Sequence, residues 1–172
     1  MITAGIDMGS RTVKVVFLEE LKVDGAPQLR WGVKGKHIMF PEDLDPDQAA
    51  DKAFEDALKS AGISRDQITR VVSTGSGRKQ VKFANADITE VGAGARGAVF
   101  MCPTAKTVVD VGAEEGRGVK ANAEGKVVDF AGNEKCAAGA GAFAESMSRA
   151  LQLSLKEFGE ASLRSDKTIP MN

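Results

Sequence analysis

Gly5-Ile-Asp-Met-Gly-Ser-Arg-Thr-Val-Lys14 is the stretch that decides the fold, because it joins two apolar runs through a short polar turn. The runs, residues 2–7 and 13–18, are rich in β-branched side chains, a composition typical of strands. The turn between them is too short for a helix, so the second strand must return beside the first. The chain is therefore predicted to open with a hairpin that carries Asp7 where its first strand ends.

A second stretch repeats this pattern. Residues 106–111 are an apolar run that contains Asp110, Gly112 follows, and residues 118–121 return as a strand after a polar turn. Such a turn presents backbone N–H groups and hydroxyls to phosphate oxygens, and its carboxylate can hold Mg²⁺ through water. Two turns of this kind facing one another would grip a triphosphate and its metal. A Rossmann or P-loop glycine turn opens into a helix instead, which neither turn here does.

The rest of the chain alternates apolar, strand-like runs with segments of helical periodicity, which predicts an α/β fold on a mixed sheet. Gly62 ends the most regular helical pattern, and Glu124-Gly125 separates the last two expected strands. Further strands are expected at residues 28–39, 68–73 and 126–130. Helices are expected from a start at residues 45–47 to residue 61, and at residues 91–101 and 137–153.

Composition and charge exclude several classes of protein. The 172 residues are enough for one compact unit, and 23 Lys and Arg nearly balance 24 Asp and Glu, so a nucleic-acid partner is disfavoured. The longest apolar stretches, such as residues 13–18, are too short to span a bilayer, and the N-terminus lacks a signal-peptide pattern. We expect a soluble, cytoplasmic protein with no nucleic-acid and no membrane partner.

The two cysteines are too few for a disulfide framework, so each needs its own explanation. Cys102, before Pro103 at an expected helix end, is interpreted as a buried small hydrophobe. Cys136 stands at the entrance of the last expected helix, where the residues alone leave packing and metal binding as alternatives. His37, the single histidine, lies on an expected strand, and nothing around it in the sequence indicates catalysis.

The two turns, Gly5-Ile-Asp-Met-Gly-Ser10 and Asp110-Val-Gly112, resemble the phosphate loops of the acetate and sugar kinase, heat-shock chaperone and actin superfamily. Asn133-Glu-Lys-Cys136-Ala-Ala-Gly-Ala-Gly141-Ala-Phe143 resembles the cysteine segment of one branch, the BadF/BadG/BcrA/BcrD-type ATPases. That branch includes activators of 2-hydroxyacyl-CoA dehydratases and ATPase subunits of benzoyl-CoA reductases. Thr74-Gly-Ser-Gly-Arg78 also stands in the family's order. The resemblance spans essentially the whole chain and implies one lobe of the actin-like ATPase fold, a mixed sheet with flanking helices.

The resemblance also implies a domain organisation. Residues 1–172 would be the N-terminal ATPase lobe, including the helix of the first cluster cysteine. The family's second cysteine would fall just beyond Asn172, with the adenosine-binding half after it, so the second lobe is expected to be missing. This chain alone should then bind nucleotide poorly and hydrolyse it slowly.

Carried over residue by residue, the resemblance implies a site for ATP and Mg²⁺. Asp7, Asp110 and Glu114 take the catalytic roles, with Glu114 ordering the attacking water or the metal. The match is looser at Ala113, Glu114 and Glu115, because many activators carry Gly, Gln and Asp in this part of the loop. The residues implied to contact the nucleotide are Gly9, Ser10, Arg11, Thr12, Lys14, Gly112 and Ala113.

In the same branch the cysteine that matches Cys136 helps to bind one 4Fe-4S cluster shared by two subunits, each of which gives two cysteines. The implied function is an ATP-dependent electron activase, which hydrolyses ATP to drive low-potential electrons from the cluster to a benzoyl-CoA reductase. Residues 133–135 favour this reductase type. The implied partners are a second ATPase subunit in a homo- or heterodimer, the reductase module that carries the acyl-CoA substrate, and ferredoxin as electron donor.

Three alternatives stay open. The chain could serve a 2-hydroxyacyl-CoA dehydratase, the same machine with another partner, and reconstitution with either enzyme would decide. It could be a small-molecule kinase of the superfamily in which Cys136 only packs, a case that the iron content separates. It could also be a non-catalytic interaction module, which would turn over no ATP even with the missing half supplied.

Overall fold

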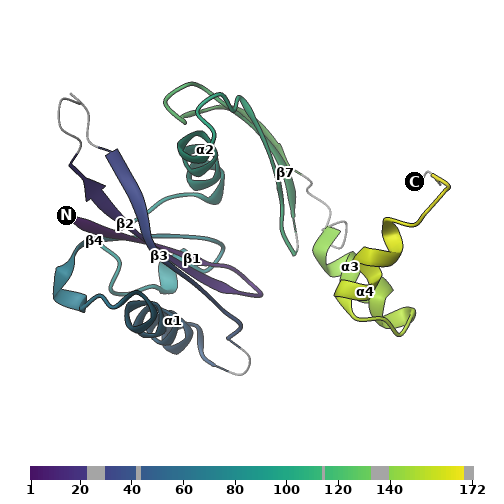
Figure 1. Cartoon of the computed structure of the whole chain (residues 1–172), viewed down its shortest axis with the longest axis horizontal. Coiled ribbons are helices and arrows are strands. Elements are labelled where there is room, and N and C mark those ends of the chain that lie inside the picture. Colours follow the sequence, from purple (N-terminus) through teal and green to yellow (C-terminus); the bar gives the residue numbers. More distant parts are fainter. Residues whose placement is uncertain (23–29, 42–43, 114, 133–139, 169–172) are drawn as a thin grey trace. The chain divides into compact units, whose positions relative to one another are not determined.

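The structure is a computed structural model of the whole chain (Figure 1). It divides into two compact units, Met1–Gly97 and Ala98–Asn172, and each is described by itself. That residues 1–172 form the first lobe of a larger ATPase stays a prediction. The residues that the structure describes are 1–22, 30–41, 44–113, 115–132 and 140–168.

The first unit is built on a five-stranded sheet. Its strands are β1 (Ile2–Met8), β2 (Val13–Leu21), β3 (Arg30–Met39), β4 (Ile68–Thr74) and β5 (Ala86–Asp87). In the order β3-β2-β1-β4-β5, the first three strands are antiparallel neighbours, which confirms the opening hairpin. Strand β4 runs parallel to β1, and β5 runs parallel to β4, so the sheet is mixed as predicted.

Helix α1 (Pro46–Ala61) covers one face of this sheet (Figure 1). Alternate residues of β1 are buried, as expected for a strand with one covered face. Phe54 of α1 meets Phe17 of β2 edge to face, with the ring centroids 5.7 Å apart, and both side chains are fully buried. The helix ends before Gly62, as predicted, and the φ of 64° at Gly62 forms a left-handed cap.

Two short turns flank β4, and one helix continues from the first unit into the second. The 3₁₀ turns η1 (Arg65–Gln67) and η2 (Arg78–Gln80) flank β4, and helix α2 (Glu90–Met101) runs from the first unit into the second. Cys102 directly follows α2 and is exposed, so its interpretation as a buried residue is wrong. Its Sγ lies 3.6 Å from the hydroxyl oxygen of Thr104, which is a polar neighbour at the end of the helix.

The second unit contains a three-stranded antiparallel sheet. Its strands, adjacent in chain order, are β6 (Thr107–Val111), β7 (Gly116–Ala121) and β8 (Val127–Gly132). The pairing of β6 with β7 confirms the second predicted hairpin. Helix α3 (Ala140–Ala150) lies within the helix expected at residues 137–153, of which residues 137–139 are outside the described part of the chain.

A further helix, α4 (Leu155–Ser162), follows in a segment for which no element was predicted. Ser154 and Glu157 form a capping box, in which each backbone N–H donates to the other residue's side chain, at 2.8 and 3.2 Å. The hydrogen bonds that the Glu157 carboxylate accepts from Ser154 hold its pKa below the ordinary value. The Ser-x-x-Glu spacing is a local signal in the sequence from which the start of this helix could have been predicted.

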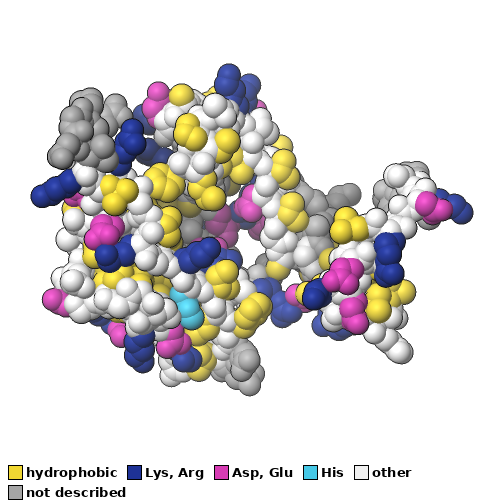
Figure 2. All heavy atoms as spheres, viewed as in Figure 1, with side chains coloured by type: hydrophobic (Ala, Val, Ile, Leu, Met, Phe, Trp, Pro, Cys, Tyr) yellow, Lys and Arg dark blue, Asp and Glu magenta, His cyan; other side chains and the backbone are white. Residues whose placement is uncertain are grey.

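Two surface features of the described ranges bear on the partners expected from the sequence. None of the helices there is long and apolar enough to cross a membrane. Figure 2 shows acidic and basic side chains interspersed over the face in view. This mixture agrees with the near balance of 23 basic and 24 acidic residues.

The packing of Phe54 predicts a large loss of stability when its ring is removed. Phe54→Ala should lower the free energy of unfolding by about 3–5 kcal/mol, because it deletes buried aromatic surface and leaves a cavity against Phe17. Phe40→Ala removes a ring that is 70% exposed, so this matched control should change stability by less than about 0.5 kcal/mol. Urea unfolding of both variants measures the difference, and equal losses would contradict the assigned core.

Candidate functional site

The first hairpin brings a carboxylate and an ammonium group together where β1 ends. Asp7 and Lys14 are direct partners in the β1–β2 register, so their side chains lie on the same face of the sheet. Lys14 Nζ donates to Asp7 Oδ2 at 2.9 Å. Both side chains are partly exposed, Lys14 at 44% and Asp7 at 36%, so the pair is accessible to a ligand.

The turn that joins these strands is a two-residue hairpin connection. The backbone N–H of Gly9 donates to the carbonyl oxygen of Thr12 at 3.1 Å, which leaves Ser10 and Arg11 at the tip. A Cβ at position 9 would lie 3.1 Å from that oxygen and 3.3 Å from Lys14 Nζ. Because Gly9 lacks a Cβ, it leaves space beside the Lys14 ammonium. Its own N–H is already used within the turn.

A second turn, which was not among the predicted site residues, supports the first. Gly75, directly after β4, has a φ of +93°, and a Cβ there would lie 2.4 Å from the Met8 carbonyl oxygen and 2.5 Å from Asp7 Oδ1. The backbone N–H of Gly77 donates to the same Met8 oxygen at 2.8 Å. Only glycine fits this approach at position 75. Asp7 is thus held between its own hairpin and the Thr74–Arg78 turn.

Charged side chains tie this supporting turn to β5. Arg78 Nη1 donates to the Gly75 carbonyl at 3.2 Å, and Arg78 Nε lies 3.3 Å from Asp87 Oδ1. Lys79 Nζ donates to Asp87 Oδ2 at 2.7 Å. The hydrogen bond from Lys79, with a smaller contribution from Arg78, holds the pKa of the Asp87 carboxyl below its ordinary value. Arg78 and Lys79 therefore act in the structure as anchors of the turn.

The second hairpin repeats the arrangement of the first. Asp110 and Arg117 are direct partners in the β6–β7 register, seven residues apart like Asp7 and Lys14. Arg117 Nη1 lies 3.9 Å from Asp110 Oδ2, and the guanidinium also contacts the Glu115 carboxylate. Arg117 is not among the predicted site residues, although it lies within the second motif. Its signal is the seven-residue spacing from the acid, which both hairpins share.

The tip of the second hairpin is closed in the same way, and it also contacts α3. The Gly112 N–H donates to the Glu115 carbonyl at 2.7 Å. The carbonyls of Gly112 and Ala113 accept hydrogen bonds from the N–H groups of Gly141 and Ala142, at 3.3 and 2.9 Å. The second loop is thus joined to the first turn of the helix that follows the cysteine segment.

Two of the expected site residues, Glu114 and Cys136, lie outside the described residues. The others fall in two groups, with Asp7, Gly9, Ser10, Arg11, Thr12 and Lys14 in the first unit and Asp110, Gly112 and Ala113 in the second. Among the side chains that the structure describes, no group of three or more His, Cys, Asp or Glu could hold a metal ion. The structure therefore describes each half of the expected phosphate site within its own unit.

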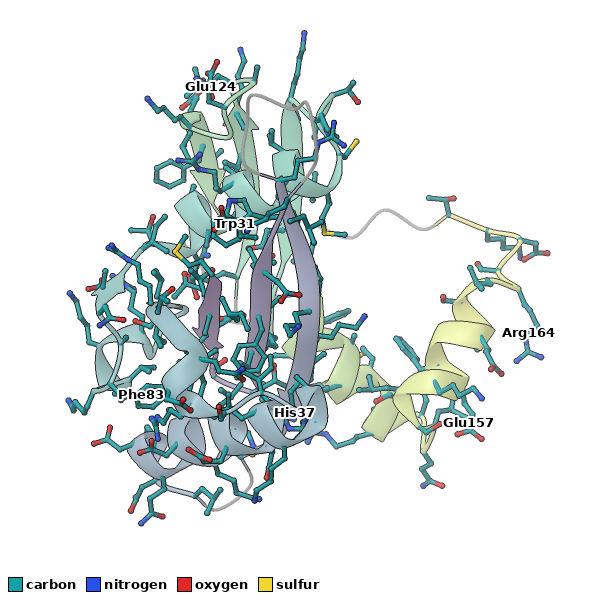
Figure 3. All side chains as sticks on the ribbon, turned by 60° about the vertical axis from the view of Figure 1, so that its left-hand side comes forward. Trp31, His37, Phe83, Glu124, Glu157 and Arg164 are labelled. Atoms are coloured by element: carbon teal, nitrogen blue, oxygen red, sulfur yellow. The ribbon has the colours of Figure 1, made fainter. Side chains whose placement is uncertain are left out.

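His37 lies on β3 beside α1 (Figure 3). It pairs with Val15, which pairs with Ile6, so these three side chains share the face that α1 covers. Asp7 and Lys14 occupy the opposite face, because they alternate with Ile6 and Val15 along the strands. That His37 has no catalytic role stays a prediction.

Two solved structures match nearly all of the chain. Component A of the (R)-2-hydroxyglutaryl-CoA dehydratase from Acidaminococcus fermentans gives a TM-score of 0.85 at 25% identity, covering 98% of this chain and 61% of that chain. The activator of the 2-hydroxyisocaproyl-CoA dehydratase from Clostridium difficile, solved with bound ADPNP, gives 0.82 at 28% identity, covering 98% and 59%. These likenesses confirm the predicted actin-like ATPase class of α/β fold.

Curated relatives extend the comparison to sequence. The activator of lactoyl-CoA dehydratase from Anaerotignum propionicum is 34% identical over 179 residues, covering 100% of this chain and 62% of the relative. A subunit of the benzoyl-CoA reductase from Thauera aromatica is 33% identical over 165 residues, covering 96% and 56%. The chain thus spans less than two thirds of the length of these relatives. Because the sequence profile of the BadF/BadG/BcrA/BcrD ATPase family matches residues 4–172, the chain belongs to that family.

Proposed function

We propose that this chain supplies the phosphate-binding hairpins of an ATP-dependent electron activase. The observation that carries the proposal is the repeated carboxylate–cation hairpin in a chain of an ATPase family, Asp7 with Lys14 and Asp110 with Arg117. A carboxylate and a cation at a strand end are the groups that a magnesium-bound phosphate requires. Residues 1–172 then form the N-terminal lobe of a protein whose relatives are longer.

The geometry of the first hairpin fits a phosphate group and its metal. Gly9 leaves open space beside the Lys14 ammonium, and the Asp7–Lys14 pair is partly exposed. Lys14 can therefore exchange its Asp7 partner for a phosphate oxygen, while the carboxylate holds water on Mg²⁺. Bound Mg²⁺ would neutralise charge on the phosphates during transfer.

The remaining site residues complete this phosphate site in the proposal. Ser10, Arg11 and Thr12 stand at or beside the tip of the first hairpin and offer hydroxyl, guanidinium and backbone donors. Gly112 and Ala113 supply the backbone of the second loop, whose carboxylate is Asp110. Glu114 orders the attacking water. Catalysis then depends on positioning and charge neutralisation rather than on a covalent intermediate.

Cys136 is proposed as one ligand of a 4Fe-4S cluster shared with a second ATPase subunit. The support is its sequence position, four residues before α3 begins, in the segment that resembles the family's cysteine motif. A shared cluster requires thiolates from both subunits, and it would supply the low-potential electron. The dimer is homomeric or heteromeric, and ferredoxin is the proposed donor.

The electron acceptor is an enzyme that acts on an acyl-CoA. Relatives named as a dehydratase activator and as a reductase subunit are 34% and 33% identical, so identity does not choose between these acceptors. We keep benzoyl-CoA reductase as the first candidate and a 2-hydroxyacyl-CoA dehydratase as the second. Reconstitution of the complete protein with each purified acceptor, ATP and a reduced donor tests both, because turnover with one acceptor alone assigns the partner.

Asp7 should be required for ATP hydrolysis but not for folding. Asp7→Asn keeps the size of the side chain and removes its charge, so kcat of the complete protein should fall by about 100-fold or more. Asp56→Asn makes the same change on α1, where the carboxylate pairs with Lys52, and should leave kcat unchanged. Steady-state phosphate release measures both variants. Full activity of Asp7→Asn would remove Asp7 from the site.

Cys136 should be required for the cluster but not for nucleotide binding. Cys136→Ser in the anaerobically purified complete protein should abolish bound iron and the visible absorption of the cluster, while the Kd for ATP stays within about two-fold. Cys102→Ser is the matched control, because the Cys102 thiol is exposed and contacts Thr104. A variant at position 136 that keeps its iron would exclude ligation by Cys136.

A further inference from the structure

The first turn of α3 is capped by the second phosphate loop. The N–H groups of Gly141 and Ala142 belong to the four that a helix cannot satisfy internally. They donate instead to the carbonyls of Gly112 and Ala113, at 3.3 and 2.9 Å. Two consecutive residues of the loop thus hold two consecutive residues of the helix, so neither segment can shift without breaking these hydrogen bonds.

The contact is close enough to require glycine at position 141. A Cβ there would lie 2.8 Å from the Ala113 Cα and 2.9 Å from the Gly112 carbonyl oxygen, and both of these are backbone atoms. By contrast, a Cβ at Gly159, which lies within α4, would meet nothing within 4 Å. A methyl group at position 141 must therefore push the helix and the loop apart.

The capping also fixes the direction of a donor in the loop. In a trans peptide unit the C=O and N–H groups point in opposite directions. Because the Gly112 carbonyl is directed to the Gly141 N–H, the N–H of Ala113, in the same peptide unit, is directed away from it. An anion that binds the loop from that side meets this N–H already oriented.

We propose that Gly141 is a positioning residue, which couples the phosphate contact of Ala113 to the first turn of α3. This proposal rests on the proposed ATP function and adds to it a specific route between the nucleotide and the helix that follows Cys136. Occupancy of the loop stabilises the capped helix turn, and by thermodynamic linkage the capped turn raises the affinity of the loop for phosphate by the same factor.

The test compares hydrogen–deuterium exchange and ATP affinity in the complete protein. In the wild type, Mg-ATP should slow exchange in peptides that cover residues 140–146 by about five-fold or more. Gly141→Ala should abolish this response and weaken ATP binding by a similar factor. Gly159→Ala should behave as the wild type. A merely structural role would lower the Tm of Gly141→Ala but leave the response of residues 140–146 to ATP intact.

A second variant serves if Gly141→Ala does not fold. Ala142→Pro removes one of the two donors, and proline is tolerated in the first turn of a helix, so it should reproduce the loss of response. ATP binding with no exchange response in the wild type, or with an unchanged response in both variants, would overturn the coupling and leave the proposed function standing. Absence of ATP binding by the wild type would overturn the proposed function and the coupling with it.

Discussion

The register of the first hairpin, which pairs Asp7 with Lys14, is the constraint on which the first unit depends. The register places both side chains on the face of the sheet that α1 leaves uncovered, because Ile6 and Val15 occupy the buried face. A slip of one residue would turn the carboxylate into the core beside Phe54. The burial of α1 therefore stabilises the sheet and also determines on which side the charged pair is presented.

The second unit presents a carboxylate and a cation on a hairpin in the same way, with different residues. Asp110 and Arg117 keep the seven-residue spacing and the direct register of Asp7 and Lys14, although the sheet around them has only three strands. Each hairpin is also met by a glycine from a later segment, Gly75 for the first and Gly141 for the second, whose missing Cβ lets two backbones touch. The carboxylate, the cation and the close glycine contact form one recurring arrangement.

The elements that could be predicted from sequence are those whose signal is local. Both hairpins and α1 follow from residues that are neighbours in the chain, and so does the cap at Gly62. The contacts of Gly75 and Gly141 could not be predicted, because the atoms that exclude a Cβ belong to segments far away in the sequence. Helix α4 was missed despite a local signal, its capping box, since its short length gives little periodicity. The exposure of Cys102 could not be predicted from the spacing of apolar residues, because it depends on which parts of the fold lie near the end of α2.

The chain order gives the second hairpin a particular position relative to the cysteine segment. Strand β8 ends at Gly132, which is the register partner of Arg117, and α3 begins with the turn that Gly112 and Ala113 cap. The segment that carries Cys136 therefore begins after the register partner of Arg117 and ends at the helix turn that contacts the tip of the same hairpin. The described residues on both sides of that segment, Gly132 and the first turn of α3, thus contact the same hairpin. This topology needs no additional element to link the proposed phosphate site of the second hairpin to the first turn of α3.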